Sequence, residues 1–243
     1  MSFVITMYVP EGVVMAADSR LTLTRSEEKN DKKIILQSVT SSDSNQKLFI
    51  IKEKFGLSIY GDAAIKNLPL AGYVNKFVEE KITEDTEITD IPNLILDFFG
   101  EPFKNPNVNF HVTGFKIENK ISIPYVYVCN IQARNVNRPN YKNGRIEYGC
   151  TWGGEGDIIA RLLFPCKLRN YRGDWEEVPH YPIAYQFFTL QDAIDFAIYA
   201  VRTTIDTIRF QPRPKTIGGP IDVLIIKPDL RPQWIQKKEY RGI

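Results

Sequence analysis

The sequence of 243 residues is poor in the two residue types that most often mark metal sites, with three cysteines and two histidines. Cys129, Cys150 and Cys166 are odd in number and never closely spaced, so they predict neither a disulfide framework nor a zinc site. His111 and His180 are isolated, which predicts structural or surface roles and no metal site. This cysteine usage is typical of a reducing compartment, and we expect a cytoplasmic protein.

Long hydrophobic runs and an excess of one charge are also absent. No stretch approaches the roughly 18 apolar residues that a membrane-spanning helix requires. The first residues have neither the basic start nor the small-residue cleavage site of a signal peptide. The formal net charge is +2 and the basic residues are spread along the chain, so we expect neither a nucleic-acid nor a membrane partner.

The common catalytic signatures are missing as well. The chain has no G-x-S-x-G elbow, no Walker A loop, no G-x-G-x-x-G after a strand and no H-E-x-x-H. We therefore expect no cofactor. The run G-G-E-G at 153–156 precedes an expected helix, but it is more typical of a tight turn than of an anion site.

Apolar, β-branched runs of strand length are frequent in a chain that is 43% hydrophobic. Pro10, Glu11 and Gly12 join the first two runs into an expected hairpin, and a second hairpin turns near Glu53. Two further strands are expected to meet near Asn119. The expected strands lie at 3–8, 13–17, 48–51, 55–60, on both sides of residue 119 within 108–129, and at 220–226.

Helical spacing of apolar residues appears in four places. The first runs from 64 to 77, where Pro69 marks either its true start or a kink. Others are expected at 92–99 and 155–163. The clearest helix follows Thr189, a plausible N-cap with Asp192 at the capping-box position.

The order of these elements is strands, two helices, strands, two helices and a strand. Segregated blocks favour a layered α+β fold over strict βαβ alternation, with helices flanking a pair of stacked antiparallel sheets. We expect one domain over 1–243. Within it, polar residues 22–46 predict a surface insertion with a short strand at 34–36, and a short tail is expected from about residue 228.

Three motifs, in this order, carry a resemblance to a known family. They are G-V-V-M-A-A-D-S-R at 12–20, then K-L-F-I-I at 47–51 with L-S-I-Y-G-D-A at 57–63, and G-G-P-I-D-V at 218–223. Together they resemble proteasome β-type subunits and their bacterial relatives, whereas the middle of the chain matches in element order only. The resemblance implies the four-layer αββα sandwich of N-terminal-nucleophile hydrolases.

The same resemblance implies roles for individual residues. Ser2 takes the place of the nucleophile, where threonine is usual in the family. Lys47 matches the active-site lysine, Asp18 the carboxylate that pairs with it, and Gly61 the glycine whose N–H stabilises the oxyanion. The residues implied to contact substrate are Leu21, Asn45, Ile59 and Ala63.

The chemistry is also reasonable without the family. A serine hydroxyl is a weak nucleophile until a base takes its proton, and a free α-amino group on the same residue can serve. Its ordinary pKa is about 7.7 to 8.0, so part of it is neutral near pH 7. A nearby Lys47 ammonium favours the neutral amine, and Asp18 holds that lysine in place. The amine becomes free only when Met1 is removed.

Departures from the family keep three functions open. The family commonly has an aspartate and a serine close before the glycine pair, but residues 210–217 contain neither, and the T-W-G-G run at 151–154 puts glycine near the family's supporting serine. The first candidate is a peptidase acting on peptide or protein substrates as a ring-like homo-oligomer, with an ATP-dependent unfolding partner of unknown identity. The others are a non-catalytic subunit with an assembly or binding role and an amidase acting on small amides.

Overall fold

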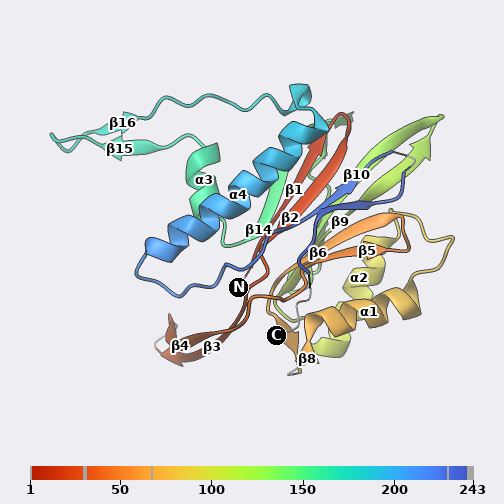
Figure 1. The fold of residues 1–243 in the computed structure, drawn as a ribbon, viewed down its shortest axis with the longest axis horizontal. Helices are drawn as coiled ribbons and strands as arrows, with labels where there is room; N and C mark the ends of the chain where they lie inside the picture. Colours follow the sequence, from red (N-terminus) through yellow and green to blue (C-terminus); the bar gives the residue numbers. More distant parts are fainter. Residues whose placement is uncertain (1, 30–31, 67, 229, 240–243) are drawn as a thin grey trace.

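The computed structural model describes residues 2–29, 32–66, 68–228 and 230–239, and its centre is a pair of five-stranded antiparallel sheets (Figure 1). In the first sheet the order is β14-β1-β2-β17-β18, and in the second it is β11-β10-β9-β6-β5. The first sheet contains β1 (Phe3–Val9), β2 (Gly12–Ala17), β14 (Gly149–Gly154), β17 (Asp222–Ile226) and β18 (Gln233–Gln236). The second contains β5 (Leu48–Ile51), β6 (Phe55–Gly61), β9 (Val108–Glu118), β10 (Ile121–Asn130) and β11 (Asn135–Asn137).

The hairpins expected from the sequence are present. β1 and β2 pair from Val9 with Gly12 inward, and β5 pairs with β6. β9 and β10 turn at Asn119 and Lys120, both with positive φ, a backbone conformation that suits a tight hairpin turn. Alternating and continuous apolar runs therefore located these strands correctly.

The helices are α1 (Leu70–Lys81), α2 (Ile91–Phe99), α3 (Asp157–Leu163) and α4 (Leu190–Phe210). Of the two alternatives for Pro69, the structure confirms that it marks the true start of the helix and not a kink. The apolar spacing from residue 64 to 69 belongs to two short strands, β7 (Ala64–Ile65) and β8 (Leu68–Pro69). Proline lacks an N–H and disfavours helical backbone before it, which is why the helix starts there.

The capping box predicted for α4 is confirmed. The Thr189 hydroxyl accepts a hydrogen bond from the Asp192 N–H, and the Asp192 carboxylate accepts one from the Thr189 N–H. Ala193, Ala197 and Ala200 line the buried face of this helix, and these small side chains let it lie close against β1 and β2.

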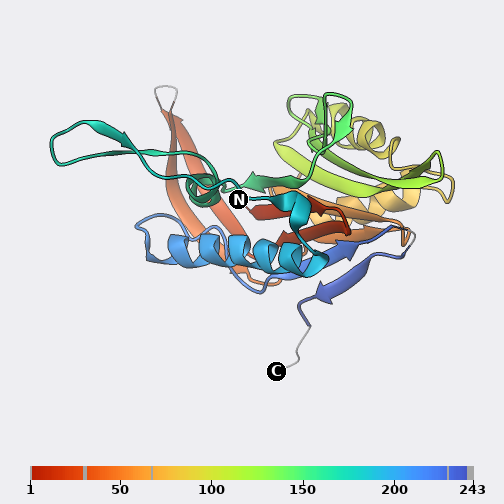
Figure 2. The ribbon, with the colours of Figure 1, turned by 90° about the horizontal axis from the view of Figure 1, so that it is seen from above.

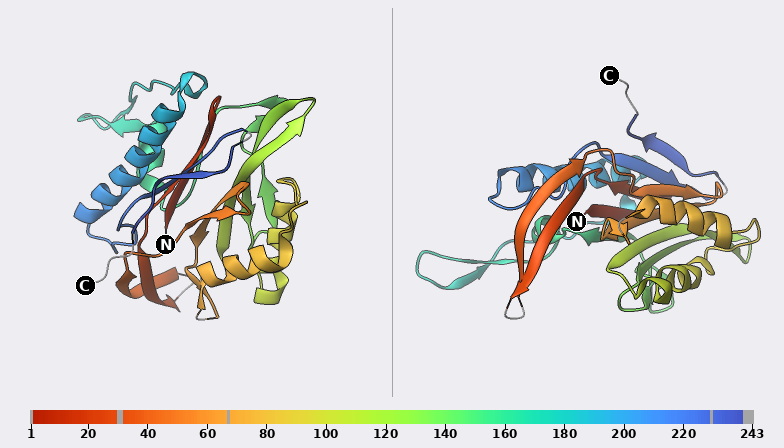
Figure 3. Two further views of the ribbon diagram at one scale, coloured as in Figure 1. Left: turned by 45° about the vertical axis from the view of Figure 1, so that its right-hand side comes forward. Right: turned by 90° about the horizontal axis from the view of Figure 1, so that it is seen from below.

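Three clusters of buried side chains hold the elements together. One lies between the two sheets and includes Val4, Met15, Leu48 and Leu224. A second joins β5, β6, β9 and β10 to α1 and α2, and a third joins the first sheet to α3 and α4. Figure 1 and the left view of Figure 3 accordingly show α4 on one side of the strands, and α1 and α2 on the other.

Two peripheral regions differ from expectation. Residues 22–46 hold two long strands, β3 (Leu21–Lys29) and β4 (Lys32–Ser42), so the prediction of a single short strand at 34–36 is wrong. Their β-branched residues are mixed with charged ones, so these strands contain no long apolar run that would indicate a strand. The expected tail contains β18, which extends the first sheet beside β17 and packs Trp234 against the cluster between the sheets.

Two hairpins extend from the body, β3–β4 and the pair β15 (Lys167–Arg169) and β16 (Trp175–Glu177), as Figure 2 and the right view of Figure 3 show. The remaining short elements are η1 (Glu101–Phe103), η2 (Tyr185–Phe187), β12 (Tyr141–Lys142) and β13 (Arg145–Ile146). None of the helices within the described ranges is long and apolar enough to cross a membrane.

Candidate active site

A buried ion pair lies where the two sheets meet. Asp18 directly follows β2 of the first sheet, and Lys47 directly precedes β5 of the second. The Lys47 Nζ is 2.6 Å from Asp18 Oδ1, and the two residues are only 2% and 1% exposed. Two charges so fully removed from water require compensating hydrogen bonds, and the Asp18 carboxylate has them.

Four donors surround that carboxylate. Oδ1 accepts from the Lys47 ammonium and from the backbone N–H of Phe3 at 2.9 Å. Oδ2 accepts from the backbone N–H groups of Arg20 and Gly218, both at 3.1 Å. Both oxygens are thus fully engaged by N–H groups, which suits an ionised carboxylate and fixes its orientation.

The peptide bond after Ser2 is held at both ends. Its N–H belongs to Phe3 and donates to Asp18, while its carbonyl oxygen, on Ser2, accepts from the Glu155 N–H at 2.9 Å. A Cβ on Gly154 would lie 1.7 Å from that oxygen, and Gly154 also has φ +90°, so only glycine fits. Ser2 is 6% exposed, and its backbone is fixed next to the Asp18–Lys47 pair.

The charge environment changes the behaviour of Lys47. Burial lowers the pKa of its ammonium from the ordinary value, and the contact with Asp18 opposes that effect only in part. Two further cations, Lys238 and Arg20, lower the pKa of Lys47 further. Lys47 therefore gives up a proton more readily than an exposed lysine does.

Gly61 ends the strand that runs beside Lys47. The Ile59 N–H donates to the Lys47 carbonyl at 3.0 Å, and Gly61 follows two residues later with φ +103°. A Cβ at Gly61 would lie 2.3 Å from the Asn107 carbonyl oxygen, so the backbone passes too closely there for any side chain. Gly61 thus lies near the Lys47 end of the site, on β6.

The four residues expected to contact substrate occupy different surroundings. Asn45 is half-buried and its N–H donates to the Ser19 carbonyl, next to Asp18; Leu21, also half-buried, begins β3. Ile59 is buried in the cluster against α1 and α2, and Ala63 is half-buried before α1. Contact of these side chains with substrate stays a prediction.

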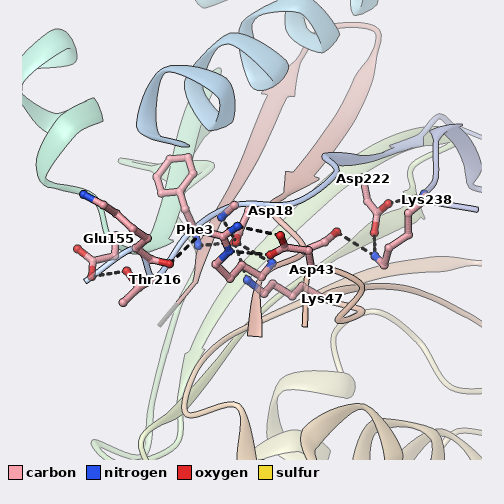
Figure 4. A network of polar contacts seen from close by, with 12 residues as sticks. Phe3, Asp18, Asp43, Lys47, Glu155, Thr216, Asp222 and Lys238 are labelled. Atoms are coloured by element: carbon pink, nitrogen blue, oxygen red, sulfur yellow. Dashed lines mark hydrogen bonds and ion pairs between the residues drawn. The ribbon is translucent and has the colours of Figure 1, made fainter. Parts of the chain in front are cut away.

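Two more ion pairs, which the sequence did not reveal, adjoin Asp18 and Lys47 (Figure 4). Arg20 binds the Asp43 carboxylate through two nitrogens, at 2.6 and 2.8 Å. Lys238, from the segment after β18, contacts the Asp222 carboxylate and donates to the Ser19 hydroxyl at 3.1 Å. Their partners are far apart in the chain, so no local spacing could have indicated them.

The residue whose N–H binds the Ser2 carbonyl, Glu155, also has a paired side chain. The Thr216 hydroxyl donates to Glu155 Oε1 at 3.1 Å, and Arg213 lies 3.6 Å from Glu155 Oε2. Glu155 is the residue whose N–H holds the Ser2 carbonyl. Residues 210–217 lack the expected aspartate and serine, but Thr216 within this stretch contributes a hydroxyl, and Glu155 from the segment before α3 contributes a carboxylate. The glycines around Glu155 were the only sequence signal there.

Other candidates for reactive or metal-binding groups are accounted for. His111 is fully buried and its Nδ1 is 2.9 Å from the Thr6 hydroxyl, whereas His180 is exposed. Burial lowers the pKa of His111 to about 3 and raises the pKa of the Cys150 thiol to about 11, so that thiol is a weak nucleophile. Within the described ranges, no three His, Cys, Asp or Glu side chains are grouped to hold a metal.

A large cavity lies apart from this chemistry. It measures about 650 Å³ and is bounded by the β5–β6 turn, by β9 and β10, and by the segment after α1. Its walls carry charges that are already paired, such as Lys116 with Glu87 and Lys54 with Glu84. Buried, converging polar groups mark a reactive site better than volume does, and these lie at Asp18 and Lys47.

Comparison with known proteins supports the fold. No protein-family model matches the sequence, and no curated protein matches it. Among solved structures, the chain is similar to the Anbu (Gly-1) mutant from Hyphomicrobium sp. strain MC1, with a TM-score of 0.57 and 16% sequence identity over 97% of this chain and 87% of that chain. At this identity the likeness shows the fold alone. The chain has a mixed α/β fold similar to the proteasome-like fold of Anbu.

Proposed function

We propose that this protein is an N-terminal-nucleophile hydrolase that cleaves peptide bonds with Ser2, after Met1 has been removed. The observation that carries the proposal is the held peptide bond between Ser2 and Phe3. The N–H of this peptide bond and the Lys47 ammonium bind the same oxygen atom, Asp18 Oδ1. Ser2, which would become the N-terminal residue, is therefore attached to a group that shares its acceptor with a buried lysine. Removal of Met1 would give Ser2 both a free amine and a hydroxyl, on the residue that precedes the N–H bound to Asp18.

The reaction follows from these groups. The neutral α-amine of Ser2 takes the hydroxyl proton while Oγ attacks the substrate carbonyl carbon, and the carbonyl oxygen gains the negative charge. The backbone N–H of Gly61 stabilises that charge, a contribution worth about 3 to 4 kcal/mol in comparable sites. The C–N bond breaks as the amine product leaves with the proton. Water then hydrolyses the ester on Ser2 by the reverse proton path.

Lys47 and Asp18 prepare the nucleophile. A cation near the α-amine lowers the pKa of that amine from its ordinary value of about 7.7 to 8.0, which increases the neutral fraction at pH 7. Asp18 holds Lys47 and the Ser2–Phe3 peptide together, so that one carboxylate orients both groups. Preorganisation of this kind removes the cost of assembling the site during the reaction.

The architecture and assembly complete this proposal. We infer a four-layer αββα arrangement within a single domain, because separate clusters lie between the sheets and on the outer face of each one. We expect a ring-like homo-oligomer in the cytoplasm, acting on peptides or on protein chains delivered by an unfolding partner.

Three measurements on natively produced protein test the proposal. Intact-mass spectrometry is expected to show the loss of Met1. A β-lactone probe, which acylates hydroxyl groups by ring opening, is expected to add its full mass at Ser2. Peptide hydrolysis is expected to vanish in Ser2→Ala, to survive in Ser2→Thr, and to be unchanged in Ser44→Ala, an exposed serine. Hydrolysis that persists in Ser2→Ala would overturn the proposal.

Two alternatives each have an observation in their favour. The absence of aspartate and serine from residues 210–217 favours a non-catalytic subunit, which would retain Met1 and resist the probe. The 6% exposure of Ser2 favours an amidase for small amides, which would hydrolyse acyl-amides of a few atoms but not peptides. The same probe and a panel of small amides separate these functions.

A further inference from the structure

The C-terminal strand brings a lysine into the candidate site. β18 pairs with β17 at the edge of the first sheet, and Lys238 follows it by two residues. Its side chain is only 9% exposed and contacts Asp222, which is itself 3% exposed. The Lys238 ammonium also donates to the hydroxyl of Ser19, the residue next to Asp18. The neighbouring Lys237, by contrast, is exposed.

Attachment of the strand does not explain this burial. β18 is already bound by its backbone pairing with β17, and Trp234 packs against the cluster between the sheets. Removing an ammonium and a carboxylate from water costs several kcal/mol per ion, and the attraction between the two charges offsets little more than that desolvation cost. Lys238 therefore contributes little net stability to the attachment of β18. Its position is better explained by its electrostatic effect on the neighbouring charged residues.

The neighbours form what we call the ion-pair cluster, three cations and three carboxylates paired one to one. The pairs are Lys47 with Asp18, Arg20 with Asp43, and Lys238 with Asp222. The charged groups that act on Lys47 are Asp18 from the end of β2, Arg20 from the segment before β3, Asp43 after β4, and Lys238 after β18. Among these, Lys238 is the group that comes from the C-terminal segment.

We propose that Lys238 is a positioning residue of the candidate site, whose ammonium, fixed by Asp222 and Ser19, adds a positive charge beside the Lys47–Asp18 pair and thereby disfavours the charged form of Lys47. The positive charge of Lys238 then reaches the site only when β18 is paired with β17. Any effect on hydrolysis rests on the function proposed for Ser2. The effect on Lys47 itself does not, and can be measured in a protein with no activity at all.

The sign of each effect follows from Coulomb interactions. A cation disfavours a second proton-bearing cation nearby, so removal of Lys238 raises the pKa of Lys47. Removal of the Asp222 charge leaves Lys238 unbalanced and lowers the pKa of Lys47. Removal of both charges together gives a value between those two. A merely structural role for Lys238 would disturb Lys47 in no such ordered way.

The test is a titration of Lys47 by nuclear magnetic resonance in the full chain labelled with ¹³Cε-lysine, with the Lys47 signal assigned by its absence in Lys47→Arg. We expect Lys238→Met to raise the midpoint by about half a pH unit or more, and Asp222→Asn to lower it. The double variant is expected to lie between them, and Lys238→Arg to match the wild type. Lys237→Met, one residue away and exposed, is the control and is expected to change nothing.

Folding is checked separately by circular dichroism, and Lys238→Gln, which keeps a polar end, is measured beside Lys238→Met. Midpoints that stay within about 0.2 pH units in both Lys238 variants, or that move the same way in Lys238→Met and Asp222→Asn, overturn the inference. Where hydrolysis is present, the alkaline side of the pH–rate profile of Lys238→Met is expected to move to higher pH, because Lys47 then keeps its charge to a higher pH. A shifted Lys47 midpoint together with full activity in Ser2→Ala would instead retain the inference and overturn the proposed function.

Discussion

The backbone N–H of Phe3 and the ammonium of Lys47 bind the same oxygen atom, Oδ1 of Asp18, at 2.9 and 2.6 Å. One carboxylate thereby ties the start of the first strand to the lysine that precedes β5 in the other sheet. The position of Ser2 and the charge of Lys47 are consequently coupled, and a change at Asp18 is expected to affect both.

Asp18→Asn tests that coupling. The amide still accepts one hydrogen bond, but the Lys47 ammonium loses its ionic partner inside the protein, and breaking a buried pair in this way costs about 3 to 5 kcal/mol. We expect the free energy of unfolding, measured with urea, to fall by that amount and hydrolysis to be lost. Asp43→Asn breaks the more exposed pair with Arg20 and is expected to cost about 1 kcal/mol or less. Equal losses in the two variants would contradict this reasoning.

Gly154→Ala tests the close approach to Ser2. The added methyl group would meet the Ser2 carbonyl oxygen at 1.7 Å, so the held peptide has to move. Gly144 is a matched control, because it also has positive φ, at +77°, yet has open space where a Cβ would lie. We expect Gly154→Ala to reduce the free energy of unfolding by at least about 2 kcal/mol more than Gly144→Ala, with loss of hydrolysis only in the former. Similar behaviour of the two variants would show that the peptide is not constrained.

His111 is expected to make the protein sensitive to acid. Burial lowers the pKa of His111 to about 3, while an unfolded chain takes up the proton near pH 6.5. The stability contribution of the neutral ring is therefore complete above about pH 6.5 and is lost as the pH falls toward 3, by up to about 1.4 kcal/mol per pH unit. In urea unfolding at about pH 7, 6, 5 and 4, the stability of His111→Gln should approach that of the wild type as the pH falls.

The exposed His180 provides the control for that series. His180→Gln measures the effect of the same substitution at an exposed position. A constant difference between wild type and His111→Gln over the same range would show that His111 does not remain neutral in the folded protein.

Thr216→Val tests whether the Glu155 carboxylate takes part at Ser2. The change keeps the shape of a side chain that is buried, but removes the donor to Glu155 Oε1. A hydrogen bond to a charged group contributes about 1.5 to 3 kcal/mol to stability, so we expect the free energy of unfolding of Thr216→Val to fall by about that amount. A fall in kcat/KM for a peptide beside it would show that the pair also acts at Ser2. Thr216→Ser retains the hydroxyl and should retain most of the activity. An unchanged kcat/KM in Thr216→Val would exclude a role for this contact.

The sequence was sufficient for the parts of the fold that repeat a pattern. Apolar runs around turns predicted β1, β2, β5, β6, β9, β10 and β17, and helical spacing with the Thr189 cap predicted α4. It was insufficient where apolar and polar residues are mixed along a strand, as in β3 and β4, which pair with each other. Helical apolar spacing begins at residue 64, but α1 starts only after Pro69. Apolar spacing alone does not show where a helix begins.

The site divides in the same way. Asp18, Lys47 and Gly61 were predicted from short motifs, and the structure brings Asp18 and Lys47 into contact beside the Ser2–Phe3 peptide. Their catalytic roles stay predictions. Lys238 was missed because it lies in a segment of ordinary composition, and Asp222 was given no role although it lies in the G-G-P-I-D-V motif. The two residues meet only when β18 joins the sheet. Ion pairs between distant segments have no fixed sequence spacing, so they can be identified only in the folded chain.

The contact between Ser19 and Lys238 joins residues that are 219 positions apart. A ribosome makes Ser2, Asp18 and Lys47 early and Lys238 much later. Under the function proposed here, a chain that has lost Met1 but does not yet contain Lys238 would have its nucleophile without this cation in the site. Full hydrolytic activity would therefore wait until translation has passed residue 238.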